Sequence, residues 1–172
     1  MTRWIALLRG INVGGVSIRS AELAALFREL GFAEVRTVLA SGNVVFETDA
    51  GQPAALKARI EQALSERFGY EAWIVLLRHA DLAAIVAGYP FAEDAEHHAY
   101  VIFSSAASSL DELLEGTDPA DATDPVAAGE GVLYWRGTKG TSTTTPFARR
   151  LAAARFRSTT TNRNIRTLRR ML

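Results

Sequence analysis

Residues 3–15, RWIALLRGINVGG, combine an unbroken apolar run with a loop that contains three glycines. Because neighbouring side chains of a strand point to opposite faces, Trp4, Ala6 and Leu8 share one face of this run, and Ile5 and Leu7 share the other. Both faces are apolar, which is typical of a central strand covered on both sides. We therefore expect the helices of the first half to cover one face of this sheet, and the second half of the chain or a partner chain to cover the other.

The remaining apolar spacing of the first half predicts two helices and three more strands. The helices are expected over residues 20–30 and 53–68, and the strands over 34–40, from 44 onward and over 72–77. The order strand, helix, strand, strand, helix, strand is that of a ferredoxin-like βαββαβ unit. This unit is predicted to form a first domain over residues 1–79.

The second half is predicted to be a related but incomplete α+β unit. Residues 80–98 are interpreted as an acidic link with a short helix over 81–87. Residues 99–172 predict strands over 100–103, near 126 and over 132–135, and helices over 110–114 and from 146. In place of a last strand we expect a basic C-terminal helix over 162–171 that packs back on the first domain. The fold class is therefore α+β.

Composition excludes several classes of protein. The 172-residue chain has no cysteine, which excludes disulfides and thiol nucleophiles and removes the usual zinc ligand. The N-terminal apolar run is too short for a signal peptide, and no segment approaches the length of a membrane span. A cytoplasmic location without a membrane partner is expected, and no cofactor or metal is predicted.

Charge is distributed unevenly although the formal net charge is zero. Residues 81–130 hold eleven Asp or Glu and no Lys or Arg, whereas residues 131–172 hold ten Lys or Arg and no acid. Such asymmetry indicates either an anion-binding tail or a basic tail that folds onto an acidic surface. We favour internal compensation, because the two segments are adjacent and their charges nearly cancel.

Several motifs together resemble a known bacterial family. They are LLRGINVGG, GF at 31–32, ASGNVVF at 40–46, LYW at 133–135 and TTTNRNIRTL at 159–168. In these motifs the chain resembles the uncharacterised family called domain of unknown function 1697 (DUF1697). The resemblance implies an α+β fold related to a ferredoxin-like duplication, and no established activity, substrate or cofactor. Arg163, Asn164 and Thr167 fit the closing motif of that family, whereas Asn162, Ile165 and Arg166 depart from it.

The favoured candidate site is an anion-binding cleft between the glycine-rich loop and the C-terminal motif. Its residues are Arg9, Asn12, Gly14, Gly15, Ser41, Asn43, Arg163, Asn164 and Thr167. A glycine-rich loop and a helix start capped by Asn162 present N–H groups to an anion, and arginine binds phosphate or carboxylate. The sequence therefore predicts a small anionic or phosphorylated ligand. The alternative is structural: the tail residues fix the chain end, and residues 41–43 form only a hairpin turn.

Two other functions remain open. Nucleic acid is a less favoured partner of the arginine-rich tail, because no aromatic RNA-binding signature lies on the central strands. An enzyme of unknown reaction is the third hypothesis, with no catalytic residue identified. One segment contains residue types used in metal or acid–base chemistry, but we interpret it as a solvated loop, because adjacent histidines rarely converge on one ion. That segment contains Glu93, Asp94, Glu96, His97 and His98.

Overall fold

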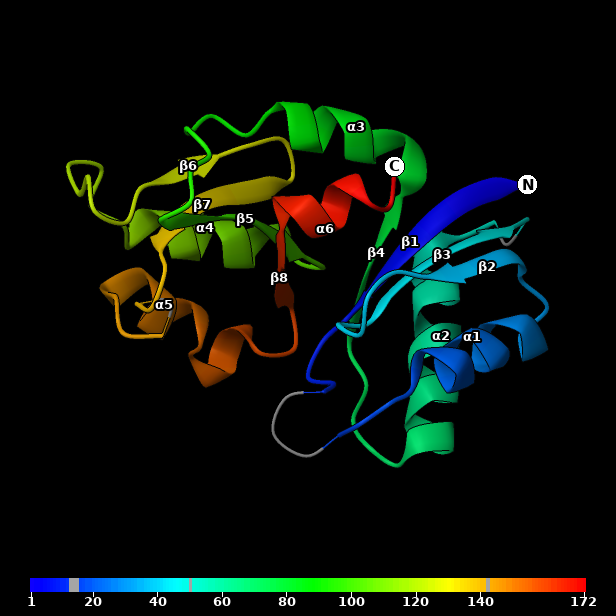
Figure 1. Ribbon diagram of the computed structural model, residues 1–172. Coiled ribbons are helices and arrows are strands. Elements are labelled where there is room, and N and C mark those ends of the chain that lie inside the picture. Colours follow the sequence, from blue (N-terminus) through cyan, green and yellow to red (C-terminus); the bar gives the residue numbers. More distant parts are fainter. Residues whose placement is uncertain (13–15, 50, 142) are drawn as a thin grey trace. The chain divides into compact units, whose positions relative to one another are not determined.

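The computed structural model describes residues 1–12, 16–49, 51–141 and 143–172. The chain divides into two compact units (Figure 1). Unit 1 contains Met1–Leu82 together with Arg170–Leu172, and unit 2 contains Ala83–Arg169. Each unit has helices and a four-stranded antiparallel sheet, which confirms the predicted α+β class.

Unit 1 has the element order that its apolar periodicity predicts. Its elements are β1 (Thr2–Leu8), α1 (Ser20–Glu29), β2 (Ala33–Thr37), β3 (Asn43–Thr48), α2 (Pro53–Phe68) and β4 (Ile74–Arg78). The strand order in the sheet is β2-β3-β1-β4. Helix α2 begins at a proline, whose fixed φ suits the first turn, and ends at Gly69 in the left-handed conformation.

The central strand β1 is buried on both faces, as its sequence predicts. Trp4 pairs with Phe46 of β3 and Ile5 pairs with Val45, so the two faces alternate along the register. The face with Trp4 and Phe46 packs against α1 and α2 through a core that includes Phe27. On the opposite face, Ile5 and Val45 are 0% and 4% exposed.

The C-terminal residues are tied to unit 1 by two hydrogen bonds. Arg36 donates from a guanidinium nitrogen to the Arg170 carbonyl at 3.1 Å. Nε2 of His79 lies 2.7 Å from the Met171 carbonyl, and the Met171 side chain is fully buried. Unit 1 therefore contains residues from both ends of the sequence.

Unit 2 repeats the same order of elements. After α3 (His79–Ala87), in which the boundary between the units falls, its elements are β5 (His97–Ser104), α4 (Ala107–Glu115), β6 (Val126–Ala128), β7 (Val132–Thr138), α5 (Pro146–Leu151), the 3-10 helix Ala154–Phe156, β8 (Thr160–Asn164) and α6 (Ile165–Arg169). The strand order is β6-β7-β5-β8, which matches that of unit 1 position by position.

The expectation of an incomplete second half was therefore wrong. The last strand exists as β8, and the predicted basic helix over 162–171 is reduced to the short α6. β8 forms because it pairs with β5 from Tyr100–Asn164 to Ser104–Thr160, a long-range contact that local periodicity does not show. Thr160 and Thr161 are buried β-branched residues, which suit a strand. Asn164, rather than Asn162, caps α6: its Oδ1 accepts from the Arg166 N–H at 3.0 Å.

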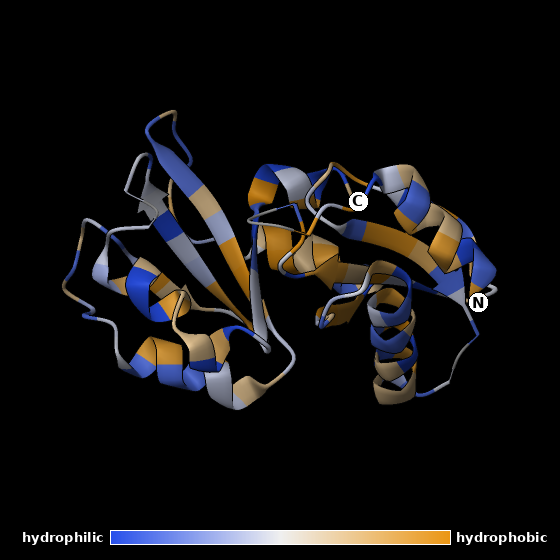
Figure 2. Cartoon of the chain, turned by 90° about the horizontal axis from the view of Figure 1, so that it is seen from below, coloured by the Kyte–Doolittle hydropathy of each residue, from blue (hydrophilic) through white to orange (hydrophobic). Residues whose placement is uncertain are grey.

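The second sheet is also covered on both faces within unit 2. Trp135 packs against Phe147 of α5 on one face, with a ring separation of 5.1 Å. On the other face, the Tyr134 hydroxyl donates to the Ile85 carbonyl at 2.6 Å, and the Tyr89 ring contacts Tyr134. The C-terminal part of α3 and the segment after it therefore lie against this face. In Figure 2, hydrophobic residues are visible on the strands, and the helices carry both hydrophobic and hydrophilic residues.

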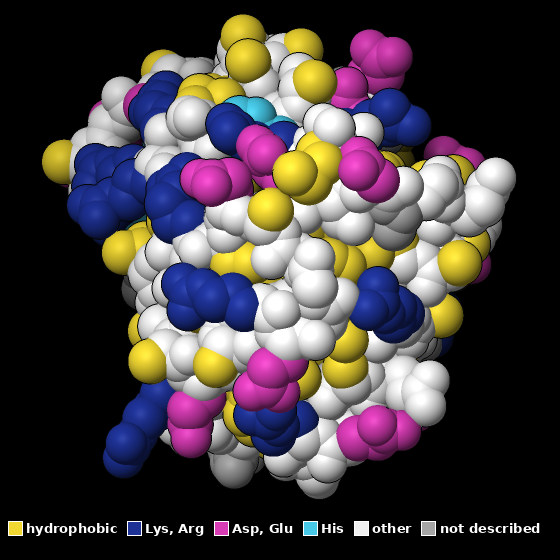
Figure 3. Space-filling view, turned by 90° about the vertical axis from the view of Figure 1, so that its right-hand side faces the viewer, with side chains coloured by type: hydrophobic (Ala, Val, Ile, Leu, Met, Phe, Trp, Pro, Cys, Tyr) yellow, Lys and Arg dark blue, Asp and Glu magenta, His cyan; other side chains and the backbone are white. Residues whose placement is uncertain are grey.

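Charged side chains of unit 1 are mixed in sign. Residues 1–80 hold nine Lys or Arg and eight Asp or Glu. Basic and acidic side chains are interspersed on the face drawn in Figure 3.

Among the described residues, no helix combines the length and the hydrophobicity that crossing a bilayer requires.

Gly42, between β2 and β3, provides a test of the packing at the end of β1. Its φ is +78°, and an added Cβ would lie 2.8 Å from both Ile11 Cδ1 and Leu8 Cβ. We expect Gly42→Ala to lower the free energy of unfolding by about 2–4 kcal/mol, because left-handed strain adds to overpacking. The control is Gly31→Ala, at φ +84° with open space around the new Cβ, which should cost about 1–2 kcal/mol. Equal losses in urea unfolding of the two variants would contradict this packing.

Candidate functional site

The predicted site residues of unit 1 hold two loops together. Asn12 has a φ of +56°. Its Nδ2 donates to the Ala40 carbonyl, and its Oδ1 accepts from the Ile18 N–H at 3.1 Å. The Asn12 side chain thus connects the loop after β1 to the loop before β3. Gly14 and Gly15, predicted to contact the same ligand, lie outside the described residues.

Ser41 and Asn43 are engaged in the turn that precedes β3. Asn43 is fully buried. Its Nδ2 donates to the Val38 carbonyl and to the Ser41 Oγ, each at 2.8 Å. The Arg9 backbone N–H donates to the Trp73 carbonyl at 3.1 Å. These contacts favour the structural interpretation of Asn12, Ser41 and Asn43, and anion binding by them remains a prediction.

The predicted site residues of unit 2 lie on β8 and α6. Arg163 is 7% exposed and donates to Thr161 Oγ1 at 2.6 Å and to the Asn162 carbonyl at 2.9 Å. Asn164 caps α6, and Thr167 is half-buried on that helix. Arg163 thus has a structural role within β8, whereas Asn164 also borders a cavity.

Unit 2 contains a cavity of about 220 Å³ where β5 begins and β8 gives way to α6. It is lined by Glu93, Asp94, His97, His98, Ala99, Lys139, Asn164 and Arg166. The site therefore unites one residue of the predicted anion site, Asn164, with four residues that the sequence analysis assigned to a solvated loop. That interpretation missed the cavity, because His97 and His98 are already part of β5 and pair with β7.

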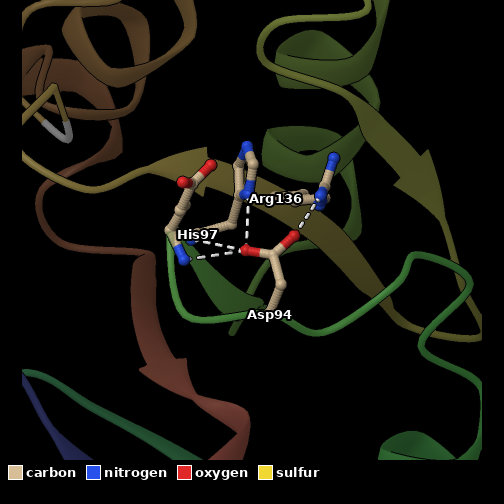
Figure 4. A network of polar contacts seen from close by, with 4 residues as sticks. Asp94, His97 and Arg136 are labelled. Atoms are coloured by element: carbon tan, nitrogen blue, oxygen red, sulfur yellow. Dashed lines mark hydrogen bonds and ion pairs between the residues drawn. The ribbon is translucent and has the colours of Figure 1, made fainter.

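The carboxylate of Asp94 is the most heavily bonded group in this cavity (Figure 4). Its Oδ1 lies 2.7 Å from Nδ1 of His97 and accepts from the backbone N–H groups of Glu96 and His97, each at 2.9 Å. Its Oδ2 accepts from the Arg136 guanidinium at 2.5 Å. The hydrogen bond from His97, followed by that from Arg136, holds the pKa of Asp94 well below its usual range. Asp94 is therefore a fixed, ionised carboxylate.

Glu93, the second acid of the cavity, is also paired. Arg169 of α6 donates to its two carboxylate oxygens at 2.8 and 2.6 Å. This hydrogen bonding lowers the pKa of Glu93 and raises that of Arg169, and the charge of Arg166 lowers the pKa of Glu93 further. A bidentate arginine–carboxylate pair is the strongest form of such a contact.

Among the described residues, two cations of the cavity have no ion-pair partner. Lys139 and Arg166 are exposed, and no carboxylate within the described part of the chain lies in salt-bridge distance of either. Burial and then the charges of Lys139 and Arg166 lower the pKa of His98, which favours its neutral form. With both acids paired, the cavity retains positive charge.

The basic tail is compensated by the acidic segment at several points in unit 2. Within the described residues, three ion pairs join residues 81–130 to residues 131–172: Arg136–Asp94, Arg155–Glu112 and Arg169–Glu93. Arg150 donates to the Glu112 carbonyl at 2.7 Å. These contacts support the internal compensation favoured from the sequence, and they occupy arginines that a nucleic-acid-binding tail would need.

A metal site and a second cavity are less well supported as functional sites. Within the described residues, no group of three or more His, Asp or Glu is arranged to hold a metal ion. A second cavity of about 240 Å³ borders Asp118, Asp121 and Asp124. Asp118 and Asp121 use one carboxylate oxygen each in local turns, with Ala120 and Thr123 as donors. The first cavity is therefore the better candidate site.

Lys139 and Arg166 are the residues of this cavity that the sequence analysis missed as ligand-binding groups. Lys139 follows β7 and carries no motif, and Arg166 departs from the closing motif of the resembled family. Both line the cavity because the Lys139 N–H donates to the Glu96 carbonyl at 2.9 Å, while Asn164 pairs with Tyr100 just before α6. No sequence pattern indicates that Lys139 and Arg166 line the same cavity.

The two antiparallel sheets and the charged cavity define an α+β protein of two similar units. The chain belongs to the family described as "Protein of unknown function (DUF1697)", whose model matches residues 1–134. This match confirms the resemblance seen in the sequence. Asn164 and Arg166 lie beyond the matched residues.

A solved structure with the same fold is that of the conserved bacterial protein SP0830 from Streptococcus pneumoniae. The two chains are 24% identical with a TM-score of 0.80, over 99% of this chain and 96% of that chain. A search of curated proteins finds no match. The similarity to SP0830 concerns the fold.

The pairing of Asp94 has a measurable dependence on pH. Because the pKa of Asp94 is lower in the folded than in the unfolded chain, its stabilising effect is complete above the ordinary aspartate pKa and is lost as pH falls below roughly 4. We expect Asp94→Asn to lower Tm at pH 7, and the difference from the parent protein to shrink as pH falls from about 5 to 3.

The control for this measurement is Asp111→Asn, at an exposed position of α4. Its Tm should differ little from that of the parent protein at either pH. A pH-independent Tm difference for Asp94→Asn would show that Asp94 acts through packing and not through its charge.

Proposed function

We propose that the protein binds a small anionic ligand, a phosphate or carboxylate compound, in the cavity of unit 2. The observation that carries this proposal is the pair of cations without ion-pair partners among the described residues, Lys139 and Arg166, beside two acids that are already paired. A bound anion would complete the charge balance. The ligand class is the one that the sequence predicted, with Asn164 as the shared residue.

The donors around the cavity suit an oxyanion. Arg166 offers a planar guanidinium that binds two oxygens at once, and Lys139 offers a compact positive charge. Asn164 uses its Oδ1 to cap α6, which leaves its Nδ2 as a further donor beside the cavity. Donors of this kind converging on one cavity bind phosphate and carboxylate groups through charge-assisted hydrogen bonds.

The size of the cavity limits the ligand. At about 220 Å³ it is smaller than the roughly 300–1,000 Å³ of sites for drug-sized ligands. The space suits a phosphate or carboxylate group with a short attached carbon skeleton. A long polyanion would have to lie outside the cavity.

Sulfate, phosphate and citrate at constant ionic strength provide the direct test. We expect at least one of them to raise Tm, with the effect saturating as concentration rises, because ligand binding to the folded state stabilises it. In Lys139→Ala/Arg166→Ala the affinity measured by calorimetry should fall roughly 100-fold, since each lost charge-assisted hydrogen bond costs about 1.5 kcal/mol or more.

The matched control is Arg149→Ala/Arg157→Ala, which removes two exposed arginines that do not line the cavity. This variant should bind the anion as the parent protein does. An equal loss in both double variants would indicate general charge attraction, and the absence of any saturable binding would refute the proposal.

A further inference from the structure

We propose that this cavity is a proton-transfer site in which His97 acts as general base toward an oxyanion ligand, with Asp94 as its positioning residue. The inference rests on the anion site proposed above. The substrate class is a small phosphate or carboxylate compound that reacts through a hydroxyl group or through a water molecule held beside the anion.

The Asp94 carboxylate determines the tautomer of His97. A carboxylate oxygen at 2.7 Å from Nδ1 accepts a hydrogen bond from that nitrogen, so the proton of the neutral ring lies on Nδ1. Nε2 then carries a lone pair. Figure 4 shows this second nitrogen pointing away from the Asp94 carboxylate, and it has no hydrogen-bond partner among the described residues.

Several hydrogen bonds hold the Asp94 carboxylate in one orientation. Besides His97 Nδ1, the carboxylate accepts from two backbone N–H groups and from Arg136. These donors fix the orientation of the carboxylate and therefore that of the imidazole ring. A flexible surface pair of histidine and aspartate would not hold one ring orientation.

The position of His97 makes it accessible to a ligand held by the two cations. His97 lines the same cavity as Lys139 and Arg166, and its side chain is 21% exposed, so a small molecule can reach it. A ligand oxyanion held by these two cations would bring its neighbouring oxygen to a base that is already oriented. Orientation of this kind is a main source of general-base catalysis.

The other two histidines of the chain lack this combination. His79 has its Nε2 at 2.7 Å from the Met171 carbonyl, so Nε2 carries the proton and donates it. His98 has no carboxylate partner in the part of the chain that the structure describes, and burial, Lys139 and Arg166 lower its pKa. Because the sequence contains only these three histidines, His79 and His98 serve as internal controls for His97.

The proposed step is balanced in atoms and charge. The O–H bond of the ligand hydroxyl or of the water breaks, the oxygen keeps the electron pair, and the proton forms an N–H bond at His97 Nε2. The resulting imidazolium lies next to the ionised Asp94, which compensates its charge. No oxidant, reductant or metal ion takes part in this step.

Two measurements on the 172-residue chain test the proposal. Nitrogen-15 NMR of the histidine rings at pH 7.5 should show His97 with its proton on Nδ1, and Asp94→Asn should shift this signature toward the mixture seen for free histidine. Diethyl pyrocarbonate, followed by peptide mass spectrometry, should carbethoxylate His97 roughly ten times faster than His79 or His98. In that reaction an imidazole nitrogen bonds to the carbonyl carbon, and the ethyl carbonate that leaves decomposes to ethanol and carbon dioxide.

Measurements with sulfate distinguish a failure of the anion-binding proposal from a failure of the proposed role of His97. Saturating sulfate should slow carbethoxylation of His97 at least fivefold in the parent protein and leave His79 unchanged. His97→Asn, which retains Lys139 and Arg166, should still bind sulfate in calorimetry. The parent measurements decide the question even where Asp94→Asn folds poorly.

Each outcome is decisive. If sulfate, phosphate and citrate all fail to bind, the proposed function is wrong and the proton-transfer site falls with it. If sulfate binds through Lys139 and Arg166, but His97 has its proton on Nε2 or reacts no faster than His79, only the role of His97 is refuted. The same holds if bound sulfate fails to protect His97.

Discussion

Burial of both faces of β1 is the constraint on which unit 1 depends. Trp4, Ala6 and Leu8 enter the core formed with α1 and α2, while Ile5 and Leu7 are buried on the opposite face. A sheet with apolar side chains on both faces loses hydrophobic free energy unless both are removed from water. The last residues of the chain also belong to unit 1, through the hydrogen bonds of Arg36 and His79 to the carbonyls of Arg170 and Met171.

In unit 2 the corresponding constraint is the pairing of acidic with basic side chains. The acidic and basic segments are separated in sequence, and the fold pairs them at Asp94, Glu112 and Glu93. Such compensation keeps oppositely charged groups close at little cost where they remain partly exposed. At the cavity this charge pairing is incomplete. Lys139 and Arg166 have no carboxylate partner among the described residues, whereas the neighbouring acids are paired, so the cavity is positively charged.

Part of this site was visible in the sequence, and part was not. The sequence singled out Asn164 and the residues from Glu93 to His98, but their interpretation as a solvated loop relied on local composition. Asp94 is three residues from His97, so a turn between them is a local feature that a closer sequence analysis could propose. The approach of Lys139 and Arg166 depends on the pairing of β5 with both β7 and β8, which joins segments far apart in the chain.

The sequence by itself determined the α+β class, the elements of the first half and the burial of β1, because these follow from apolar periodicity and from the glycine and proline positions. Only the tertiary structure decided that residues 160–164 form a strand. Ile165 and Leu168 have helical spacing, but the polar residues before them gain cross-strand hydrogen bonds with β5 that no local pattern encodes. The cavity has the same origin: its charges come from three separate segments, and only long-range strand pairing brings them together.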